Sequence, residues 1–114
     1  MYKLSIVVVY YEKDEKYMET LLRSLPVWAE WVLVKSVKDG TDTTVERANN
    51  VVKAFYNYTG KFDFMESKNY AKQYATGEWI LWLDDDEHLD ILQHDYLKDL
   101  VTNVDDTIGG MYCT

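Results

Sequence analysis

The sequence is poor in cysteine and in basic residues. Its single cysteine, Cys113, excludes an intrachain disulfide and fits a reducing, cytoplasmic compartment. Lysine and arginine number 12 against 20 aspartate and glutamate residues, so the formal charge is −8. Because an acidic surface repels a phosphate backbone, this balance argues against a nucleic-acid partner. A small phosphorylated ligand stays compatible, since a bridging divalent cation reverses the local charge.

The sequence also lacks an apolar run long enough to span a bilayer. The longest, Leu4–Tyr11, follows Lys3 and resembles the core of a signal peptide in length. No small-residue cleavage site follows it, so we interpret it as a buried strand. There are no repeats, low-complexity tracts or linkers, and residues 1–114 are predicted to form one domain.

Strand-like and helix-like segments alternate along the chain. The predicted strands are Leu4–Tyr10, Trp31–Val37, Lys61–Met65, Glu78–Leu83 and Ile108–Cys113. The predicted helices are Asp14–Leu25, a segment that follows Thr43, Ser67–Thr76 and a segment that opens at Asp90. This alternation predicts a Rossmann-like, three-layer α/β sandwich with a mostly parallel sheet and helices on both faces.

Individual positions support these helices. Thr43 and Glu46 have the spacing of a capping box, and an apolar stripe follows them: Val45, Ala48, Val51, Val52 and Phe55. The first helix would turn one apolar face inward: Tyr17, Met18, Leu21, Leu22 and Leu25. The third would bury Tyr70, Ala71, Tyr74 and Ala75, and Gly77 is placed where a helix stop belongs.

Two acidic segments follow predicted strands. Asp84-Asp85-Asp86 comes directly after Leu83, and Asp39 lies in a turn-rich loop after the second strand. In sheets of this class, ligands bind beyond the carboxyl ends of the strands. In an extended chain the first and third carboxylates would point the same way, about 7 Å apart. They suit Mg²⁺ or Mn²⁺, but a solvated turn or an acidic flank of the helix at Asp90 explains the cluster equally well.

The segment Lys68–Asp86 resembles the central signature of family 2 glycosyltransferases of the GT-A fold. In that family a basic residue and Asn open a helix, Ala-x-Gly-Glu closes it, and an apolar strand leads into an Asp-x-Asp motif. Here these places are taken by Lys68-Asn69, by Ala75-Thr76-Gly77-Glu78 and by Asp84-Asp85-Asp86.

Softer matches extend the resemblance along the chain. Tyr11 keeps the aromatic residue of the family's Pro-x-Tyr-Asn-type turn, although Val9 and Glu12 replace its proline and asparagine. The loop Asp39-Gly40-Thr41-Asp42 is similar to the family's Asp-Gly-Ser-x-Asp loop, one residue shorter. Residues 108–112 are similar to the strand after the metal-site helix.

The resemblance implies roles for these residues. Asp39 would accept a hydrogen bond from the nucleotide base, and Tyr11 would lie against that base. Asp84 and Asp85 would contact the ribose or help to hold the metal. Asp86 would be the direct ligand of Mn²⁺ or Mg²⁺. Lys68 would help to balance phosphate charge, or is simply an exposed helix lysine.

The implied reaction is glycosyl transfer from a nucleoside-diphosphate sugar (a UDP- or GDP-sugar) to an unknown acceptor. No catalytic base can be named, because the resemblance covers only the donor-binding half of a GT-A-like fold. A second copy or another chain would then complete the acceptor site. His88 and His94 are interpreted as surface residues. Two alternatives stay open: a nucleotide-binding module without transferase activity, and a phospho-accepting signalling domain that uses Asp84.

Overall fold

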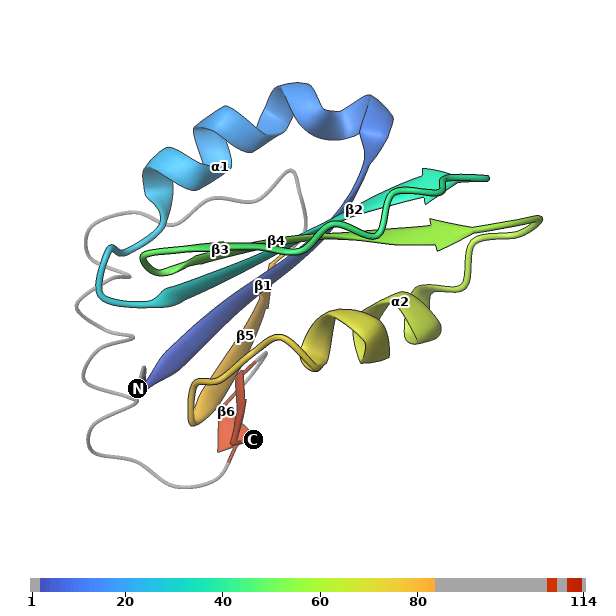
Figure 1. Ribbon diagram of the computed structural model, residues 1–114. Helices are drawn as coiled ribbons and strands as arrows, with labels where there is room; N and C mark the ends of the chain where they lie inside the picture. The colour runs from blue at the N-terminus through green and yellow to red at the C-terminus, as the bar shows by residue number, and fades with distance from the viewer. Residues whose placement is uncertain (1–2, 84–106, 109–110, 114) are drawn as a thin grey trace.

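The computed structural model of the protein describes residues 3–83, 107–108 and 111–113. The strands are β1 (Leu4–Tyr11), β2 (Glu30–Lys38), β3 (Glu46–Ala48), β4 (Val51–Tyr58), β5 (Trp79–Leu83), β6 (Thr107–Ile108) and β7 (Met111–Cys113). The helices are the 3₁₀ helix η1 (Glu12–Tyr17) and the α-helices α1 (Met18–Ser24) and α2 (Phe64–Lys72). Figure 1 shows their arrangement.

The described strands form one mixed sheet in the order β3-β4-β2-β1-β5-β7-β6. Its centre, β4-β2-β1-β5, is parallel, and Val7 of β1 lies between Val32 of β2 and Trp82 of β5. The outer strands β3, β7 and β6 pair antiparallel. The chain builds outward from β1 through β2 to β4 and then returns to the other side of β1. This reversal places a topological switch point between β1 and β5.

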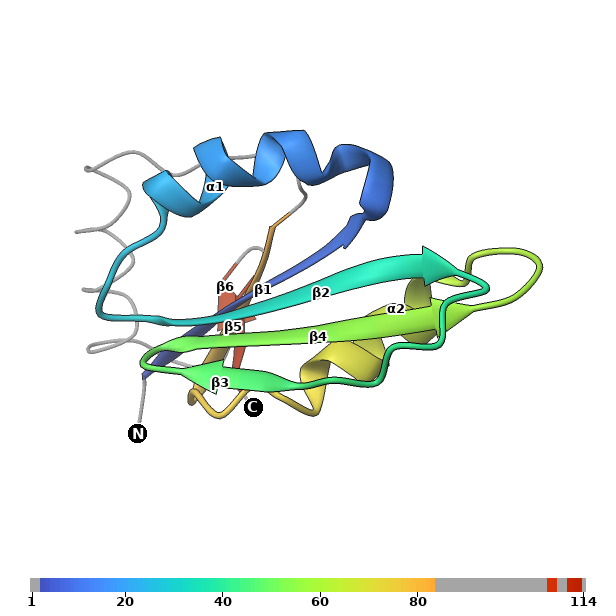
Figure 2. The same ribbon diagram turned by 45° about the horizontal axis from the view of Figure 1, so that its top comes forward.

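Helices cover both faces of the sheet, as predicted: η1 and α1 lie on one side and α2 on the other (Figures 1 and 2). Successive residues of a strand point to opposite faces. Leu4, Ile6 and Val8 therefore pack with Met18, Leu21 and Leu25 of the α1 side. On the other face Val7 joins a cluster with Ala71 of α2: Val32, Val34, Val52, Ala54, Tyr56 and Ile80. The predicted three-layer architecture is confirmed.

The helix predicted after Thr43 is wrong, because this stretch forms the hairpin β3-β4. Asn49 and Asn50 connect the two strands, and Asn49 adopts a positive φ of 53°, which asparagine tolerates better than most residues. Along β4, Val52, Ala54 and Tyr56 are buried while Lys53 is exposed. This period of two, together with β-branched and aromatic residues, outweighs the apparent helical stripe.

The strand predicted over Lys61–Met65 is also wrong. Asp63 instead caps α2, its side chain accepting a hydrogen bond from the backbone N–H of Glu66 at 3.0 Å. Helix α2 therefore begins at Phe64, before the predicted start at Ser67, and ends at Lys72. Its predicted inward residues do pack on the sheet: Tyr70, Ala71, Tyr74 and Ala75.

The segment predicted as the first helix is split. It starts as 3₁₀ helix η1 directly after β1, without a side-chain cap, and becomes α-helical at Met18. Tyr17, predicted to face inward, is 46% exposed, whereas Met18, Leu21 and Leu25 are buried. Among the described helices, none is both long and apolar enough to cross a membrane.

The C-terminal part of the chain contributes two short strands in place of the single predicted strand Ile108–Cys113. β7 pairs with β5 and with β6, so Met111 lies opposite both Leu81 and Ile108. The helix predicted to open at Asp90, together with His88 and His94, lies outside the described residues.

A buried carboxylate stabilises the amino-terminal edge of the sheet. Glu30, at the start of β2, is 4% exposed and accepts hydrogen bonds from Ser5 Oγ, Thr76 N and Thr76 Oγ1, each at 2.8 Å. Gly77 N–H donates to Ser5 Oγ at 2.8 Å, and a Cβ at Gly77 would stand 2.7 Å from Ser5 N. Gly77 is therefore explained by close backbone approach and not, as predicted, by a helix stop.

Candidate nucleotide site at the carboxyl edge of the sheet

The carboxyl ends of β1, β2, β4 and β5 lie at one edge of the sheet, which is where parallel α/β proteins bind ligands. β5 ends at Leu83, opposite Val8, while β1 continues to Tyr11. Tyr11 and Leu83, the last residues of their strands, therefore flank the switch point between β1 and β5. Asp39 follows the end of β2, the neighbour of β1 on the other side.

Tyr11 belongs to an aromatic cluster on the α2 face of this edge. Its ring centroid lies 4.9 Å from that of Phe62. Phe62 in turn lies 5.3 Å from Tyr58, at the end of β4, and 6.2 Å from Phe64, at the start of α2. The tilted and edge-on geometries are those that aromatic pairs prefer. The half-buried Tyr11 ring is thus fixed by its neighbours, and the ammonium group of Lys13 lies 5.6 Å from its centroid.

Asp39 is exposed at the first position of the loop after β2 and has a positive φ of 56°. Its backbone N–H donates to the carbonyl oxygen of Tyr58 at 2.6 Å, which ties the loop to the end of β4. Further along the loop, Thr44 N–H donates to Asp42 Oδ1 at 2.9 Å. Hydrogen bonds from the side chain and the backbone of Thr44 lower the pKa of Asp42. The loop is therefore a defined structure that presents the Asp39 carboxylate to solvent.

Lys68 is half-buried on α2, so it does not project freely into solvent. Its ammonium group lies 4.6 Å from the ring centroid of Phe64 and 5.2 Å from that of Trp82. Both distances fall within the range of cation–π attraction. Because Trp82 lies two positions before Asp84 in the sequence, Lys68 is held beside the strand that leads into the acidic cluster.

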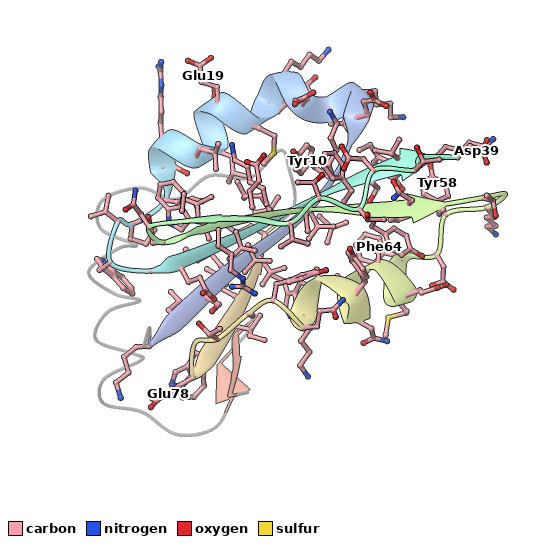
Figure 3. The ribbon with its side chains drawn as sticks, viewed as in Figure 1. Tyr10, Glu19, Asp39, Tyr58, Phe64 and Glu78 are labelled. Atoms are coloured by element: carbon pink, nitrogen blue, oxygen red, sulfur yellow. The ribbon has the colours of Figure 1, made fainter. Side chains whose placement is uncertain are left out.

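The structure brings three of the predicted residues to one edge. Tyr58 connects to Asp39 through the backbone and to Tyr11 through Phe62, and Phe64 links the same cluster to Lys68. Figure 3 shows Asp39, Tyr58 and Phe64 toward the same end of the molecule. The other predicted site residues, Asp84, Asp85 and Asp86, lie outside the described residues. Within residues 3–83 and the two short C-terminal strands, no cluster of three potential metal ligands occurs.

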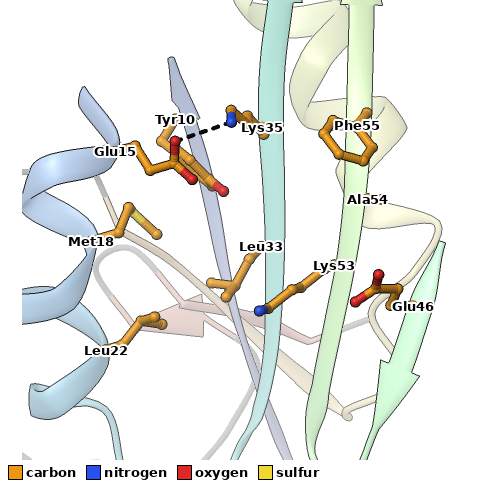
Figure 4. A pocket seen from close by; sticks show the side chains of 10 residues that line it. All are labelled: Tyr10, Glu15, Met18, Leu22, Leu33, Lys35, Glu46, Lys53, Ala54 and Phe55. Atoms are coloured by element: carbon orange, nitrogen blue, oxygen red, sulfur yellow. Dashed lines mark hydrogen bonds and ion pairs between the residues drawn. The ribbon is translucent and has the colours of Figure 1, made fainter. Parts of the chain in front are cut away.

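A separate cavity of about 350 Å³ lies on the opposite face, between α1 and the sheet (Figure 4). Lys35 and Glu15, which both line this cavity, form an ion pair at 3.1 Å. Burial and the nearby charge of Glu15 raise the pKa of Tyr10, which also lines the cavity. Of the predicted site residues that the structure describes, Tyr11, Asp39 and Lys68, none lines this cavity.

Comparison with known proteins agrees with this architecture. A protein-family model described as glycosyl transferase family 2 matches residues 5–113. The chain belongs to glycosyltransferase family 2. No curated protein matched the chain.

Among solved structures, the crystal structure of residues 1–349 of TarS from S. aureus is similar to this fold. The TM-score is 0.62 and the sequence identity 22%, and the match covers 88% of this chain and 32% of the TarS chain. The family 2 chain therefore spans about a third of that structure. At this identity the likeness concerns the fold.

Sequence reasoning missed several residues of this edge. Phe62 packs against Tyr11 and Tyr58 packs against Phe62, and the signal for both was the density of aromatic residues from the end of β4 to the start of α2. The Trp82 ring lies 5.2 Å from the Lys68 ammonium group, a contact between helix and strand that local sequence does not reveal. Asn57, whose side chain reaches the Asp39 loop, gave no signal because its contact depends on how β2 and β4 pair.

Proposed function

We propose that this family 2 domain binds the nucleoside diphosphate of a sugar donor at the carboxyl edge of its sheet, in order to transfer the sugar to an acceptor. The observation that carries the proposal is the convergence of Tyr11 and Asp39 beside the switch point of a family 2 fold. In this arrangement the Asp39 carboxylate accepts a hydrogen bond from the base. The ring of Tyr11, supported by Phe62, lies against the base.

The diphosphate would be bound between β1 and β5. Asp86 and Asp84 would hold Mn²⁺ or Mg²⁺, since hard divalent cations take carboxylate oxygens together with substrate phosphates. Such an ion supplies stabilisation of the negative charge that develops on the departing diphosphate. Asp85 would contact the ribose. The Lys68 ammonium group, held between Phe64 and Trp82 of β5, adds positive charge that would help to balance the phosphates.

The acceptor site and its catalytic base would be supplied by a second copy of the chain or by another chain. We also propose a cytoplasmic location, because a chain with a single cysteine fits a reducing compartment.

Binding is tested by titrating UDP and GDP into the protein by calorimetry, with and without Mn²⁺. We expect Mn²⁺-dependent binding of at least one nucleotide. Asp39→Ala should weaken nucleotide binding by roughly tenfold, as expected for one hydrogen bond to a charged group, and should leave the affinity for free Mn²⁺ unchanged. Equal loss of both affinities would contradict a role for Asp39 in recognising the base.

The metal site is tested by Asp86→Ala, which should abolish the Mn²⁺-dependent part of nucleotide binding. Glu78→Ala is the matched control, since Glu78 is an exposed acid directly before β5, at the opposite edge of the sheet, and pairs with Lys3 at 2.9 Å. Unchanged UDP or GDP affinity of Asp86→Ala in the presence of Mn²⁺ would remove this residue from the site. Release of nucleotide from a UDP- or GDP-sugar would show turnover, and tight binding without release would indicate a binding module.

A further inference from the structure

The loop that carries Asp39 is bound by a side chain of the neighbouring strand. Asn57 lies on β4 opposite Val37 of β2, close to the carboxyl edge. Its Nδ2 group donates to the carbonyl oxygen of Asp42 at 2.7 Å. One strand therefore holds the loop that leaves its neighbour, and the loop is bound at both ends, at Asp39 by the backbone of Tyr58 and at Asp42 by Asn57.

The other atom of the Asn57 amide also contacts the loop. Asn57 Oδ1 is buried and has no hydrogen-bond partner among the described residues. A Cβ at Gly40 would collide with this oxygen and would stand 2.8 Å from Cγ1 of Val37. The loop backbone at Gly40 is thus packed directly on the Asn57 side chain, and only a glycine leaves room for that approach.

These contacts fix the conformation of the residue that presents its carboxylate. Asp39 has a positive φ of 56°, a conformation that non-glycine residues adopt at a cost. The hydrogen bonds at Asp39 and at Asp42 keep the loop in this conformation before any ligand arrives. A loop that is already ordered loses less conformational entropy on binding, and hydrogen bonds to a base tolerate only small angular errors.

We propose that Asn57 is a positioning residue for nucleotide recognition, which acts by holding the Asp39 loop in its binding conformation. The inference rests on the proposed function, because it needs Asp39 to contact the nucleotide base. Asn57 itself contacts the loop and not the ligand. Its effect is therefore confined to the part of the affinity that depends on Asp39.

The test compares the affinities for nucleotide and for pyrophosphate, each with Mn²⁺. The nucleotide is UDP or GDP, whichever the wild-type protein binds more tightly. Asn57→Ala should weaken the nucleotide about threefold to tenfold, the range expected from one neutral hydrogen bond. The affinity for pyrophosphate, which has no base for Asp39 to contact, should stay unchanged. Equal weakening of pyrophosphate would indicate general damage and would overturn the proposal.

A double-mutant cycle gives the sharper result. In an Asp39→Ala background, Asn57→Ala should cause no further loss of nucleotide affinity, because the group through which Asn57 acts has been removed. Additive losses would overturn the positioning role. Asn57→Thr, which suits a strand but cannot reach the Asp42 carbonyl, should reproduce Asn57→Ala and guards against a variant that fails to fold.

Asn50→Ala provides the matched control. Asn50 also uses its Nδ2 group to bind loop carbonyls, those of Ala29 at 2.9 Å and Val27 at 3.4 Å, but at the opposite edge of the sheet. Its loss should lower stability without changing nucleotide affinity. If the wild-type protein binds neither UDP nor GDP, the proposed function fails and this role fails with it. If the wild type binds and Asn57→Ala binds equally well, only the positioning role is wrong.

Discussion

The carboxylate of Glu30 is buried at the amino-terminal edge of the sheet, where it accepts one hydrogen bond from Ser5 and two from Thr76, residues far apart in the sequence. These bonds join the start of β2 to β1 and to the segment that precedes β5. A buried donor that loses its acceptor bears the full cost of desolvation. Glu30 therefore contributes to stability through the donors that it satisfies.

Glu30→Ala should lower the free energy of unfolding by about 2–4 kcal/mol, because Thr76 N–H and two hydroxyl groups lose their acceptor. Glu30→Gln should cost about 1 kcal/mol, since its carbonyl oxygen can still accept from Thr76 N and the hydroxyl groups can reorient. Urea denaturation followed by circular dichroism measures both values.

Glu19→Ala is the control for this pair. Glu19 is an exposed acid on α1 that bonds Arg23 at 2.6 Å and points away from the sheet (Figure 3). Its removal should change stability by less than about 0.5 kcal/mol. If Glu30→Ala lowered the free energy of unfolding as little as Glu19→Ala, the hydrogen bonds of Glu30 would not contribute to stability.

At the scale of elements, the hairpin β3-β4 takes the place of the helix that the spacing of Thr43 and Glu46 predicted. Asn49 turns the chain with a positive φ of 53°. Two signals in the sequence favoured the hairpin: the Asn49-Asn50 pair, and the polar residues Lys53 and Asn57 placed between apolar residues of a strand-like run. The Asn turn and the two-residue alternation of the strand proved stronger than the capping-box spacing, because that spacing involves only Thr43 and Glu46 at the start of the segment.

Substitutions at Asn49 test the turn. Asn49→Gly should give a free energy of unfolding within about 1 kcal/mol of the wild type, or a higher one, since glycine adopts positive φ without steric cost. Asn49→Val should lower stability by about 1–3 kcal/mol, because a β-branched residue is strained in this region. Thermal unfolding measures both. If the valine variant matched the wild type, the segment would not make this turn.

At the scale of the whole molecule, the aromatic residues that pack against α2 couple stability to alkaline pH. Burial, the hydrogen bond shared with the Tyr74 hydroxyl and the negative charge of an ionised Tyr74 raise the pKa of Tyr70 to about 12. Burial, with the charges of Glu66 and Asp63, also raises the pKa of Tyr56. Both groups are neutral in the folded protein at pH values where they begin to ionise in the unfolded chain.

Because both pKa values are raised in the folded protein, the free energy of unfolding should decrease at alkaline pH. Below about pH 10, the ordinary pKa of tyrosine, both states hold the proton and the stabilisation is complete. Above it the unfolded chain loses the proton first, so stability should fall as the pH rises through 10 toward 12. Denaturant midpoints between pH 8 and pH 11.5 measure this fall. Tyr70→Phe should reduce its slope, and an unchanged slope would mean that Tyr70 does not titrate differently in the two states.

The sequence by itself determined the fold class, the parallel strands β1, β2 and β5, and the family resemblance, because these depend on local patterns of apolar residues and on short motifs. Only the tertiary structure decided that Tyr11, Asp39 and Lys68 surround one aromatic cluster, and that Asn57 holds the Asp39 loop. It also decided why Gly77 must be glycine, through its contact with Ser5. Strand order and register create these contacts between distant residues, and neither is written in local sequence spacing.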